Sequence, residues 1–480
     1  MGLPLFERAR RRRADPRWGI EVRLADMQAD YGLPRGSHPE DALHQCEDGG
    51  VRDGVNKHRR PYEPRVISPS RESWLGPLRS AQILNPDDHL VGLGFHTSVP
   101  PAEPESALGG TLFLEDGSRF DGVGFGARAR RVGEVVFTTG MVGYPETLTD
   151  PSFRGQILTF TYPLLGNYGV PRRGVVDSNG LPVGFESSSI QVRGMIARGL
   201  TAPHHWDSVG TLPSWLEEEG VPGVCGIDTR RLTEHLRTEG VVRGIIDVGP
   251  PEDRPSSEEL LREIGQAPSY ADEKYMGAVS PRAPEILGGG RGPLVAVLDC
   301  GIKTSILRAL VERGTSVLRL PYDHEVPARF EGRRVSGLLV GNGPGDPEQL
   351  ARTVEELRRP STRALPTLGI CLGLQLIALA RGASTYKMKF GHRGQNKTIV
   401  FPDGRALIVS ENHGYAVDPK SFKPSGLRAW GMNPDDGTLE GLRDPRGNAF
   451  ALQGHPEGHP GPQEAGFVFD HFLGKVKRRA

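Results

Sequence analysis

A cysteine flanked by glycines is the residue of this chain best placed for covalent chemistry. Cys371 lies in the run Gly-Ile-Cys-Leu-Gly at residues 369–373, after a short apolar run and before a helical pattern. A nucleophile on such a strand-to-helix turn is exposed at the carboxyl edge of a sheet. The N-terminus of the helix favours the thiolate, and the backbone N–H of Leu372 would point at a developing oxyanion. By itself the motif fits a buried core cysteine equally well.

A histidine and a glutamate near the C-terminus could complete a triad. Residues 453–457 read Gln-Gly-His-Pro-Glu. In an extended segment residues i and i+2 share a face, so Glu457 can orient the imidazole of His455. The alternative for this motif alone is a surface loop rich in His and Pro, since His459 lies beside it. In the order Cys then His-x-Glu, the two motifs together predict nucleophilic catalysis by a Cys–His–Glu triad.

A glycine-rich loop supplies the third candidate element. Residues 341–347 read Gly-Asn-Gly-Pro-Gly-Asp-Pro and follow an apolar run. Such a loop leaves backbone N–H groups free at the carboxyl end of a sheet, where doubly wound folds bind ligands. It lacks the Lys and Ser/Thr of a P-loop. It could instead give Cys371 a second oxyanion donor, and an ordinary turn is the alternative.

The elements that must position these motifs follow an α/β rhythm. Short apolar runs alternate with helical patterns, which predicts a mainly parallel, doubly wound sheet. The expected strands are 294–299, 316–320, 335–341 and 367–370, and the expected helices are 305–314, 347–359 and 374–381. The preceding part of the chain mixes expected strands with one helix, which predicts a mixed α/β domain. Its strands are expected at 111–114, 133–139 and 156–161, and its helix at 229–238.

Composition divides the 480 residues into four parts. Residues 1–108 are rich in Arg, Pro, Asp and His without a periodic apolar pattern, which predicts a disordered extension outside the core. Residues 109–247 form the first domain. Residues 248–292 have the Pro, Ser and Gly content of a linker. Residues 293–480 form the domain that carries the site.

The bulk composition excludes several classes. Lys plus Arg and Asp plus Glu both number 59, so no net charge favours nucleic acid or a membrane surface. No apolar run reaches the roughly 18–20 residues of a membrane span. The four cysteines show neither CxxC pairing nor a disulfide pattern. We therefore expect no metal site and a cytoplasmic location.

The three motifs together resemble class I, triad-type glutamine amidotransferases. The resemblance lies in residues 342–347, 369–375 and 453–462. Within that class, further segments resemble the small-subunit family of carbamoyl-phosphate synthetases. They are residues 111–117, 140–146, 148–153, 158–169, 226–233, 299–303, 387–396 and 412–415. The resemblance runs from about residue 110 to the C-terminus and does not cover the first 108 residues.

The resemblance implies a role for each matching position. Cys371 would be the nucleophile, His455 the general base and acid, and Glu457 its orienter. The oxyanion N–H groups would come from Gly343 and Leu372. The side chains and backbone that hold glutamine would be those of Ser152, Gly345, Gln375, Asn412, Gly414 and Tyr415, with Ser152 reaching in from the first domain. The chain departs from the family pattern at Leu374, where many members have His, which alters the surroundings of the thiol.

The implied reaction is hydrolysis of L-glutamine through a cysteine thioester. The ammonia would pass to a large subunit that forms carbamoyl phosphate from bicarbonate and ATP, for arginine and pyrimidine synthesis. No cofactor is expected in this chain, which has no Walker or ATP-grasp motif, so ATP and a divalent cation are expected on the large subunit. Two alternatives remain: a glutaminase subunit of another synthase, which the first-domain motifs disfavour, and a catalytically weak interaction subunit, which the intact triad disfavours.

Overall fold

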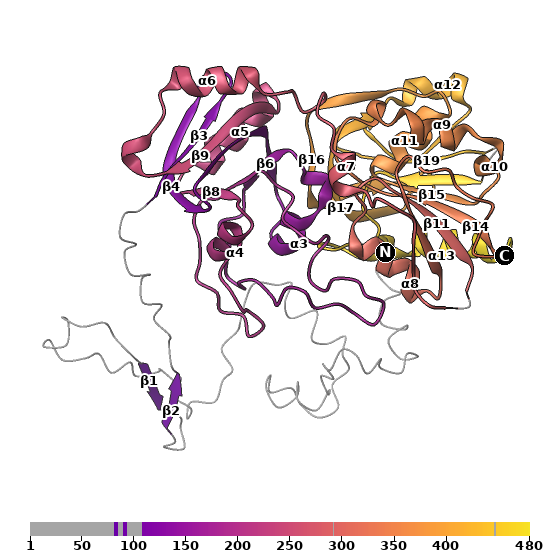
Figure 1. The fold of residues 1–480 in the computed structure, drawn as a ribbon, viewed down its shortest axis with the longest axis horizontal. Helices are drawn as coiled ribbons and strands as arrows, with labels where there is room; N and C mark the ends of the chain where they lie inside the picture. The colour runs from indigo at the N-terminus through magenta and orange to yellow at the C-terminus, as the bar shows by residue number, and fades with distance from the viewer. Residues whose placement is uncertain (1–80, 85–89, 94–107, 291, 446–447) are drawn as a thin grey trace, which may run out of the picture. The chain divides into compact units, whose positions relative to one another are not determined.

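The computed structural model describes residues 81–84, 90–93, 108–290, 292–445 and 448–480 (Figure 1). The chain divides into two units, residues 1–97 and 98–480. In the first unit, strands β1 (Ala81–Leu84) and β2 (Leu90–Leu93) form an antiparallel hairpin. The predicted disorder of residues 1–108 otherwise falls outside the described residues and stays a prediction.

The second unit begins with a closed seven-stranded barrel in the order β3-β4-β8-β7-β6-β5-β9. Its strands are β3 (Gly109–Leu114), β4 (Arg119–Gly126), β5 (Ala129–Thr138), β6 (Gln156–Phe160), β7 (Gly194–Ile196), β8 (Pro222–Cys225) and β9 (Val242–Gly249). The run β5-β6-β7-β8 is parallel, and the other pairs are antiparallel. Helices α3 (Tyr144–Thr149), α4 (Leu212–Glu218) and α5 (Thr229–Glu239) complete the predicted mixed α/β domain.

Helix α5 shows how the sequence sets these elements. The side chain of Asp228 caps its first turn by accepting from the N–H of Arg231, and Gly240 ends it with a φ of 106°. Leu232 and Leu236 lie one turn apart and are fully buried against the barrel strands.

The segment predicted as a linker folds against its neighbours. It contains α6 (Ser257–Gln266), α7 (Met276–Val279) and β10 (Glu285–Leu287). Ser256 caps α6, whose Leu260 and Ile264 pack one turn apart on Phe113 and Ile245 of the barrel. Composition suggested a linker because few residues in this segment are apolar. Two apolar residues at helical spacing are nevertheless enough to pack one face of α6 against the barrel.

The second domain is built on one eleven-stranded sheet in the order β10-β12-β11-β14-β15-β20-β19-β18-β16-β17, with β13 beside β14. Its strands are β11 (Leu294–Asp299), β12 (Ser316–Pro321), β13 (Arg329–Phe330), β14 (Arg333–Val340), β15 (Thr367–Ile370), β16 (Thr385–Val400), β17 (Ala406–Val417), β18 (Arg428–Met432), β19 (Leu439–Arg443) and β20 (Ala449–Leu452). The central strands β12, β11, β14, β15 and β20 are parallel, as predicted. The long β16–β17 ribbon and its neighbours form an antiparallel extension that the sequence reading did not include.

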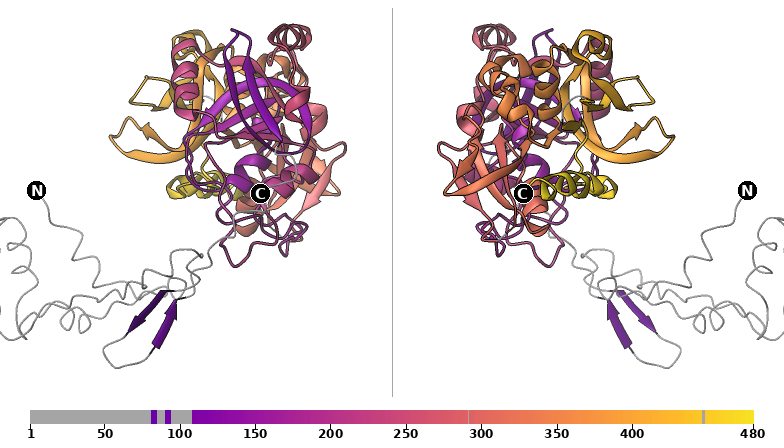
Figure 2. Two further views of the ribbon diagram at one scale, coloured as in Figure 1. Left: turned by 90° about the vertical axis from the view of Figure 1, so that its left-hand side faces the viewer. Right: turned by 90° about the vertical axis from the view of Figure 1, so that its right-hand side faces the viewer.

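Helices cover both faces of this sheet (Figures 1 and 2). Successive residues of β11 alternate between two cores, with Val295 in one and Ala296 in the other. One core includes α8 (Thr304–Glu312) and α13 (Phe467–Lys477), and the other includes α9 (Ala351–Arg358) and α11 (Leu372–Ala380). The short helices α10 (Pro360–Arg363) and α12 (Phe422–Ser425) complete the domain. This is the predicted doubly wound arrangement.

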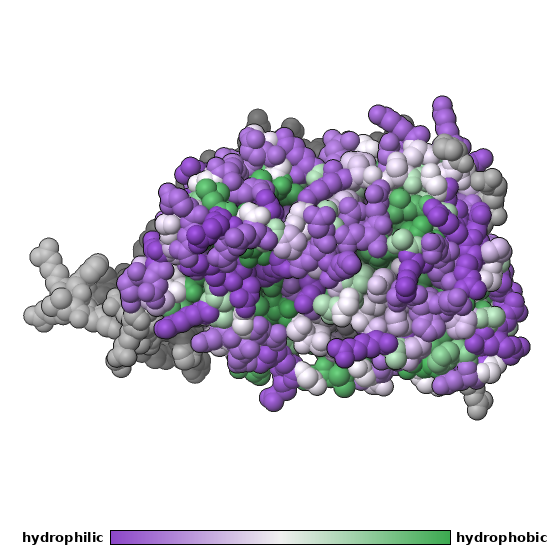
Figure 3. Space-filling model, turned by 45° about the horizontal axis from the view of Figure 1, so that its top comes forward, coloured by the Kyte–Doolittle hydropathy of each residue, from purple (hydrophilic) through white to green (hydrophobic). Residues whose placement is uncertain are grey.

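The outer face shown in Figure 3 is mostly hydrophilic, with hydrophobic side chains in small separate patches. Among the described helices, none has both the length and the apolar character that crossing a membrane requires.

Candidate active site

Cys371 occupies a strained turn between β15 and α11. Its φ of 53° and ψ of −108° make it one of only two described non-glycine residues with positive φ. The flanking glycines are required by close backbone approach, because a Cβ on Gly373 would lie 2.1 Å from the carbonyl oxygen of Val340. The N–H of Cys371 donates to the carbonyl of Leu452 at 2.9 Å, which fixes the turn to the neighbouring strand. The predicted nucleophile elbow is therefore present in the backbone.

His455 and Glu457 follow β20, which pairs in parallel with β15. The two strands end side by side, so their carboxyl ends bring Cys371 and His455 to the same edge of the sheet. Nδ1 of His455 lies 2.7 Å from Oε1 of Glu457, and both side chains are buried. Nε2 forms no hydrogen bond of normal geometry within the described residues. This nitrogen is therefore the one left to exchange a proton.

The electrostatics of the pair keep His455 charged at neutral pH. Burial opposes the imidazolium, but the Glu457 carboxylate and the nearby Cys371 outweigh it and raise the pKa of His455 to about 10. Burial likewise opposes the Glu457 carboxylate, but Lys303 and His455 together hold its pKa well below its usual range. The result is a carboxylate fixed between two cations.

Lys303 is a member of this cluster that the sequence reading did not single out. Its Nζ lies 2.8 Å from Oε1 of Glu457 and also donates to the carbonyl of His459. Burial opposes its charge, but Glu457, Glu186 and Asp150 together raise the pKa of Lys303 above its usual value. The only available signal was its place in the family-like segment 299–303, which carried no assigned role.

A buried carboxylate of the first domain also reaches this cluster. Glu186 accepts from the hydroxyl of Ser305 at 2.7 Å and lies 2.5 Å from Nδ1 of His459. Burial opposes its charge, but Lys303 and His459 lower the pKa of Glu186. His459, which could have belonged to a free surface loop, is instead held between the two domains.

One pocket gathers all the residues predicted to bind glutamine around Cys371. Its lining includes Ser152, Gly343, Gly345, Leu372, Gln375, Asn412, Gly414 and Tyr415. It also includes four residues that sequence reasoning missed, namely Gln156, Tyr270, Arg393 and His413. Arg393 is buried and supplies the only guanidinium among the described residues that line this pocket.

The pocket lies where the two domains meet. Ser152 belongs to a short 3-10 turn of the first domain, η3 (Pro151–Phe153), and its Oγ accepts from Nδ2 of Asn342 at 2.9 Å. Asn412 on β17 donates from Nδ2 to Oδ2 of Asp150 at 3.1 Å. The reach of Ser152 from the first domain, expected from the resemblance, is thus present in the structure.

The glycine-rich loop passes tightly beside the elbow. A Cβ on Gly343 would lie 1.8 Å from the carbonyl oxygen of Cys300, so only glycine fits there. The N–H of Gly345 donates to the hydroxyl of Tyr270 at 3.0 Å. Gly343 and Leu372 both line the pocket beside Cys371, as an oxyanion role requires.

Polar side chains under the pocket reach the thiol. Gln375 donates from Nε2 to the carbonyl of Tyr415 at 2.8 Å and to Oε1 of Gln453 at 3.1 Å. Gln453 in turn donates to Sγ of Cys371 at 3.4 Å. Leu374 is fully buried in the apolar core that contains α11, so the departure from the family pattern places a hydrophobic side chain there.

Comparisons with known proteins define the class. Residues 296–475 match the model for the class-I glutamine amidotransferase family, and residues 112–246 match that for the CPSase domain of the carbamoyl-phosphate synthase small chain. The carbamoyl phosphate synthase small chain of Sulfolobus acidocaldarius is 46% identical over 364 residues, covering 76% of this chain and 95% of the relative.

Two further relatives agree. The small chain of Pyrococcus furiosus is 43% identical over 366 residues, covering 76% of this chain and 96% of its own length. The carbamoyl phosphate synthase arginine-specific small chain of Phaeosphaeria nodorum is 41% identical over 382 residues, covering 78% of this chain and 77% of the relative. The chain belongs to the carbamoyl-phosphate synthase small chain family, and its second domain is a glutamine amidotransferase domain.

Proposed function

We propose that this chain hydrolyses L-glutamine at Cys371 and delivers the ammonia to the large subunit of a carbamoyl-phosphate synthase. The observation that carries the proposal is the placement of Cys371 on a strained elbow, beside the Glu457–His455 pair and in a pocket lined by every predicted glutamine-binding residue. Family membership supports the same activity.

The first half-reaction forms a thioester. The Cys371 thiolate attacks the side-chain carbonyl carbon of glutamine, and the resulting oxyanion is held by the N–H groups of Gly343 and Leu372. His455, charged at neutral pH, then donates its Nε2 proton to the nitrogen as the C–N bond breaks. Ammonia leaves, and a γ-glutamyl thioester remains on Cys371.

The second half-reaction restores the enzyme. His455, now neutral, takes a proton from water as the water oxygen attacks the thioester carbon. The C–S bond breaks, the thiolate and imidazolium reform, and glutamate leaves as its new γ-carboxyl group releases a proton to solvent. Glu457 holds the ring through Nδ1 in both steps, while Lys303 keeps Glu457 ionised. Arg393, as the guanidinium of the pocket, is suited to the α-carboxylate of the substrate.

The partner would be the large subunit, where ATP and a divalent cation would be used and the product would enter arginine and pyrimidine synthesis. Exposed apolar residues of the first domain support a docked partner. Of the thirteen exposed large hydrophobic side chains in the described residues, eight lie between positions 141 and 209, including Trp206 at 87% exposure. The free thiols of Cys225, Cys300 and Cys371 support a reducing, cytoplasmic location.

The test is carbamoyl-phosphate synthesis with the matching large subunit, comparing glutamine and ammonia as nitrogen source. Adding this chain should confer use of glutamine without being needed for use of ammonia. A complex that uses only ammonia would overturn the proposal. Co-purification with a different synthase that consumes this chain's ammonia would favour the alternative of another glutaminase subunit.

A further inference from the structure

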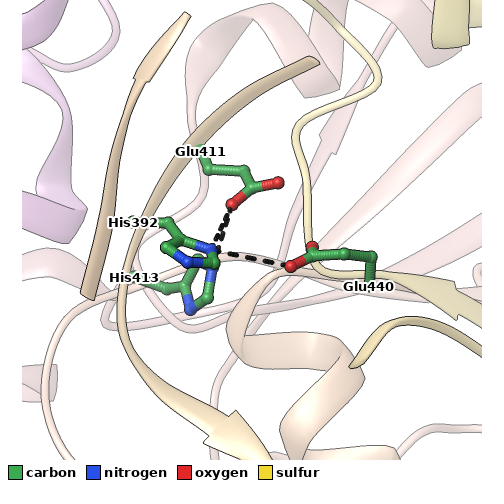
Figure 4. A group of neighbouring side chains, drawn as sticks. All are labelled: His392, Glu411, His413 and Glu440. Carbon is green, nitrogen blue, oxygen red and sulfur yellow. Dashed lines mark hydrogen bonds and ion pairs between the residues drawn. The ribbon is translucent and has the colours of Figure 1, made fainter. Parts of the chain in front are cut away.

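A second cluster of ionisable side chains lies beside the glutamine pocket, on the antiparallel end of the sheet. His392 comes from β16, Glu411 and His413 from β17, and Glu440 from β19. All four are buried, and one ligand atom from each lies within 4.8 Å of the others. Figure 4 shows the carboxylates of Glu411 and Glu440 turned toward the imidazoles of His392 and His413.

Three separations between these ligand atoms are close to those of a tetrahedral metal site, and all of the separations are within 4.8 Å. Nδ1 of His392 lies 2.9 Å from Oε2 of Glu411 and 3.6 Å from Oε1 of Glu440. Nε2 of His413 lies 3.2 Å from the same Oε2 of Glu411. Zinc bound about 2.0–2.1 Å from nitrogen and oxygen ligands places neighbouring ligand atoms about 3.3–3.5 Å apart. The four side chains therefore need little movement to enclose one ion.

Both imidazoles are held by the outer partners that metal-binding histidines use. Nδ1 of His413 lies 2.8 Å from the carbonyl oxygen of Tyr415, which can only accept, so the proton is on Nδ1 and Nε2 faces Glu411. Nε2 of His392 lies 2.9 Å from Oδ2 of Asp436, which leaves Nδ1 facing the cluster. Metal ligands of this type donate their other N–H to a carbonyl or carboxylate in the same way.

The charges of the cluster also call for a cation. Within the described residues, neither Glu411 nor Glu440 pairs with a Lys or Arg; the only ion-pair partners of these two buried carboxylates are histidines. Oε1 of Glu411 and Oε2 of Glu440 are buried without a hydrogen-bond partner. A protonated His392 can compensate only one of the two buried carboxylates, whereas a divalent cation would compensate both.

We propose that His392, Glu411, His413 and Glu440 bind a divalent transition-metal ion, zinc by preference. Two nitrogen and two oxygen ligands in a tetrahedral set suit zinc better than magnesium or calcium. Four protein ligands leave no open position, so the ion is structural. It ties β16, β17 and β19 together next to Asn412, Gly414 and Tyr415, and so braces one wall of the glutamine pocket. The exposed Asp436 marks the side from which the ion enters.

This site departs from the expectation of no metal in this chain. That expectation considered the cysteines, which do lack zinc-binding spacing. The proposed ligands are instead spread over residues 392–440 and are brought together only by strand pairing, in which His392 faces His413 across the β16–β17 ladder.

The test begins with the wild-type full chain. Its metal content is measured by inductively coupled plasma mass spectrometry, and its thermal unfolding is followed with added zinc and after chelation. We expect one tightly held metal ion per chain and a higher unfolding temperature with zinc. Cobalt substitution should give the intense visible absorption of a tetrahedral N/O site. No stoichiometric metal and no shift of unfolding with zinc would overturn the proposal.

Variants then locate the ion. Glu440→Gln keeps the shape but removes a charged ligand, and should abolish stoichiometric zinc and the response of unfolding to chelation. Asp436→Asn, which keeps the shape of the side chain but removes the charge beside His392, should weaken zinc affinity about 10- to 100-fold. His204→Ala removes an exposed histidine and is the matched control. Full zinc binding in both Glu440→Gln and Glu411→Gln would place the metal elsewhere and refute the site.

Discussion

Lys303 forms a buried ion pair with Glu457, with 2.8 Å between Nζ and Oε1. The side chains are 4% and 1% exposed, so neither charge is compensated by water. The same Oε1 accepts from Nδ1 of His455. The orienting carboxylate of the proposed triad is thus itself held by a cation from another element, and catalysis and stability are coupled at this point.

The first prediction concerns that pair. Lys303→Met should lower the free energy of unfolding by up to about 3–5 kcal/mol, because it leaves the buried Glu457 and Glu186 carboxylates with only their histidine partners. Glutaminase activity should fall as well. Without Lys303, protonation of Glu457 becomes more favourable, and a neutral Glu457 no longer holds His455 through a carboxylate. Chemical denaturation and glutamine turnover measure the two effects.

Its control is Arg230→Met, which removes an exposed ion pair with Glu234 on α5 and should change stability by less than about 0.5 kcal/mol. Adding Glu457→Gln to Lys303→Met should recover part of the lost stability. Equal stability of Lys303→Met and the wild type would show that the buried ion pair between Lys303 and Glu457 does not stabilise the fold.

A second prediction separates nitrogen sources. Cys371→Ser should reduce glutamine-dependent carbamoyl-phosphate synthesis by about a thousandfold or more, because serine is a far weaker nucleophile at this elbow. Ammonia-dependent synthesis by the same complex should persist, which also shows that the subunits still assemble. Glutaminase activity surviving in Cys371→Ser would rule out Cys371 as the nucleophile.

A third prediction ranks the two histidines and the glutamate. His455→Ala should cost more turnover than Glu457→Ala, by about tenfold or more, since an orienter is less costly to lose than the base. His459→Ala should leave turnover nearly unchanged, because Lys303 contacts only the backbone carbonyl of His459. It should still lower stability by about 1–3 kcal/mol, since Glu186 loses a buried partner.

Steady-state kinetics and denaturation on the three variants check this order. A collapse of turnover in His459→Ala with intact folding would mean that the wrong histidine was assigned as base.

A fourth prediction follows from the pKa of His455. Because that pKa is raised to about 10, the imidazolium persists through neutral pH, and kcat/KM for glutamine should fall only as pH approaches 10. Glu457→Gln removes the main group that raises the pKa, so the alkaline fall should move to lower pH. The raised pKa of His455 also affects stability, because the imidazolium is favoured in the folded state over the unfolded state. The resulting contribution to the free energy of unfolding is fully present below pH 6.5 and is lost as pH rises through about 10. An unmoved alkaline limb in Glu457→Gln would contradict the pairing.

Sequence reasoning found the elements whose signals are local. The elbow at Cys371, the parallel strands and helix α5 each follow from residues adjacent in the chain, so their positions could be predicted. The residues for which the family resemblance implies glutamine binding also line one pocket. The closed barrel and the β16–β17 extension were not specified, because strand order depends on pairings between distant segments.

Two of the missed site residues, Glu186 and Lys303, have partners that are far away in sequence. Glu186 meets Ser305 across 119 positions, and Lys303 meets Glu457 across 154. No spacing rule connects such pairs. Tyr270 was missed for a related reason, since it lies in a segment whose composition predicted a linker without contacts.

The last prediction tests that segment. The hydroxyl of Tyr270 accepts from the N–H of Gly345 at 3.0 Å, and both residues line the glutamine pocket. Tyr270→Phe would leave this half-buried backbone donor without its partner, which costs up to about 1–3 kcal/mol. Because the loop is proposed to hold the substrate and not to carry the proton, the loss should raise KM for glutamine about tenfold with a smaller change in kcat. Tyr322→Phe, a half-buried tyrosine outside the pocket lining, is the matched control. If Tyr270→Phe leaves KM unchanged, the segment 248–292, which was predicted to be a linker, does not shape the glutamine pocket.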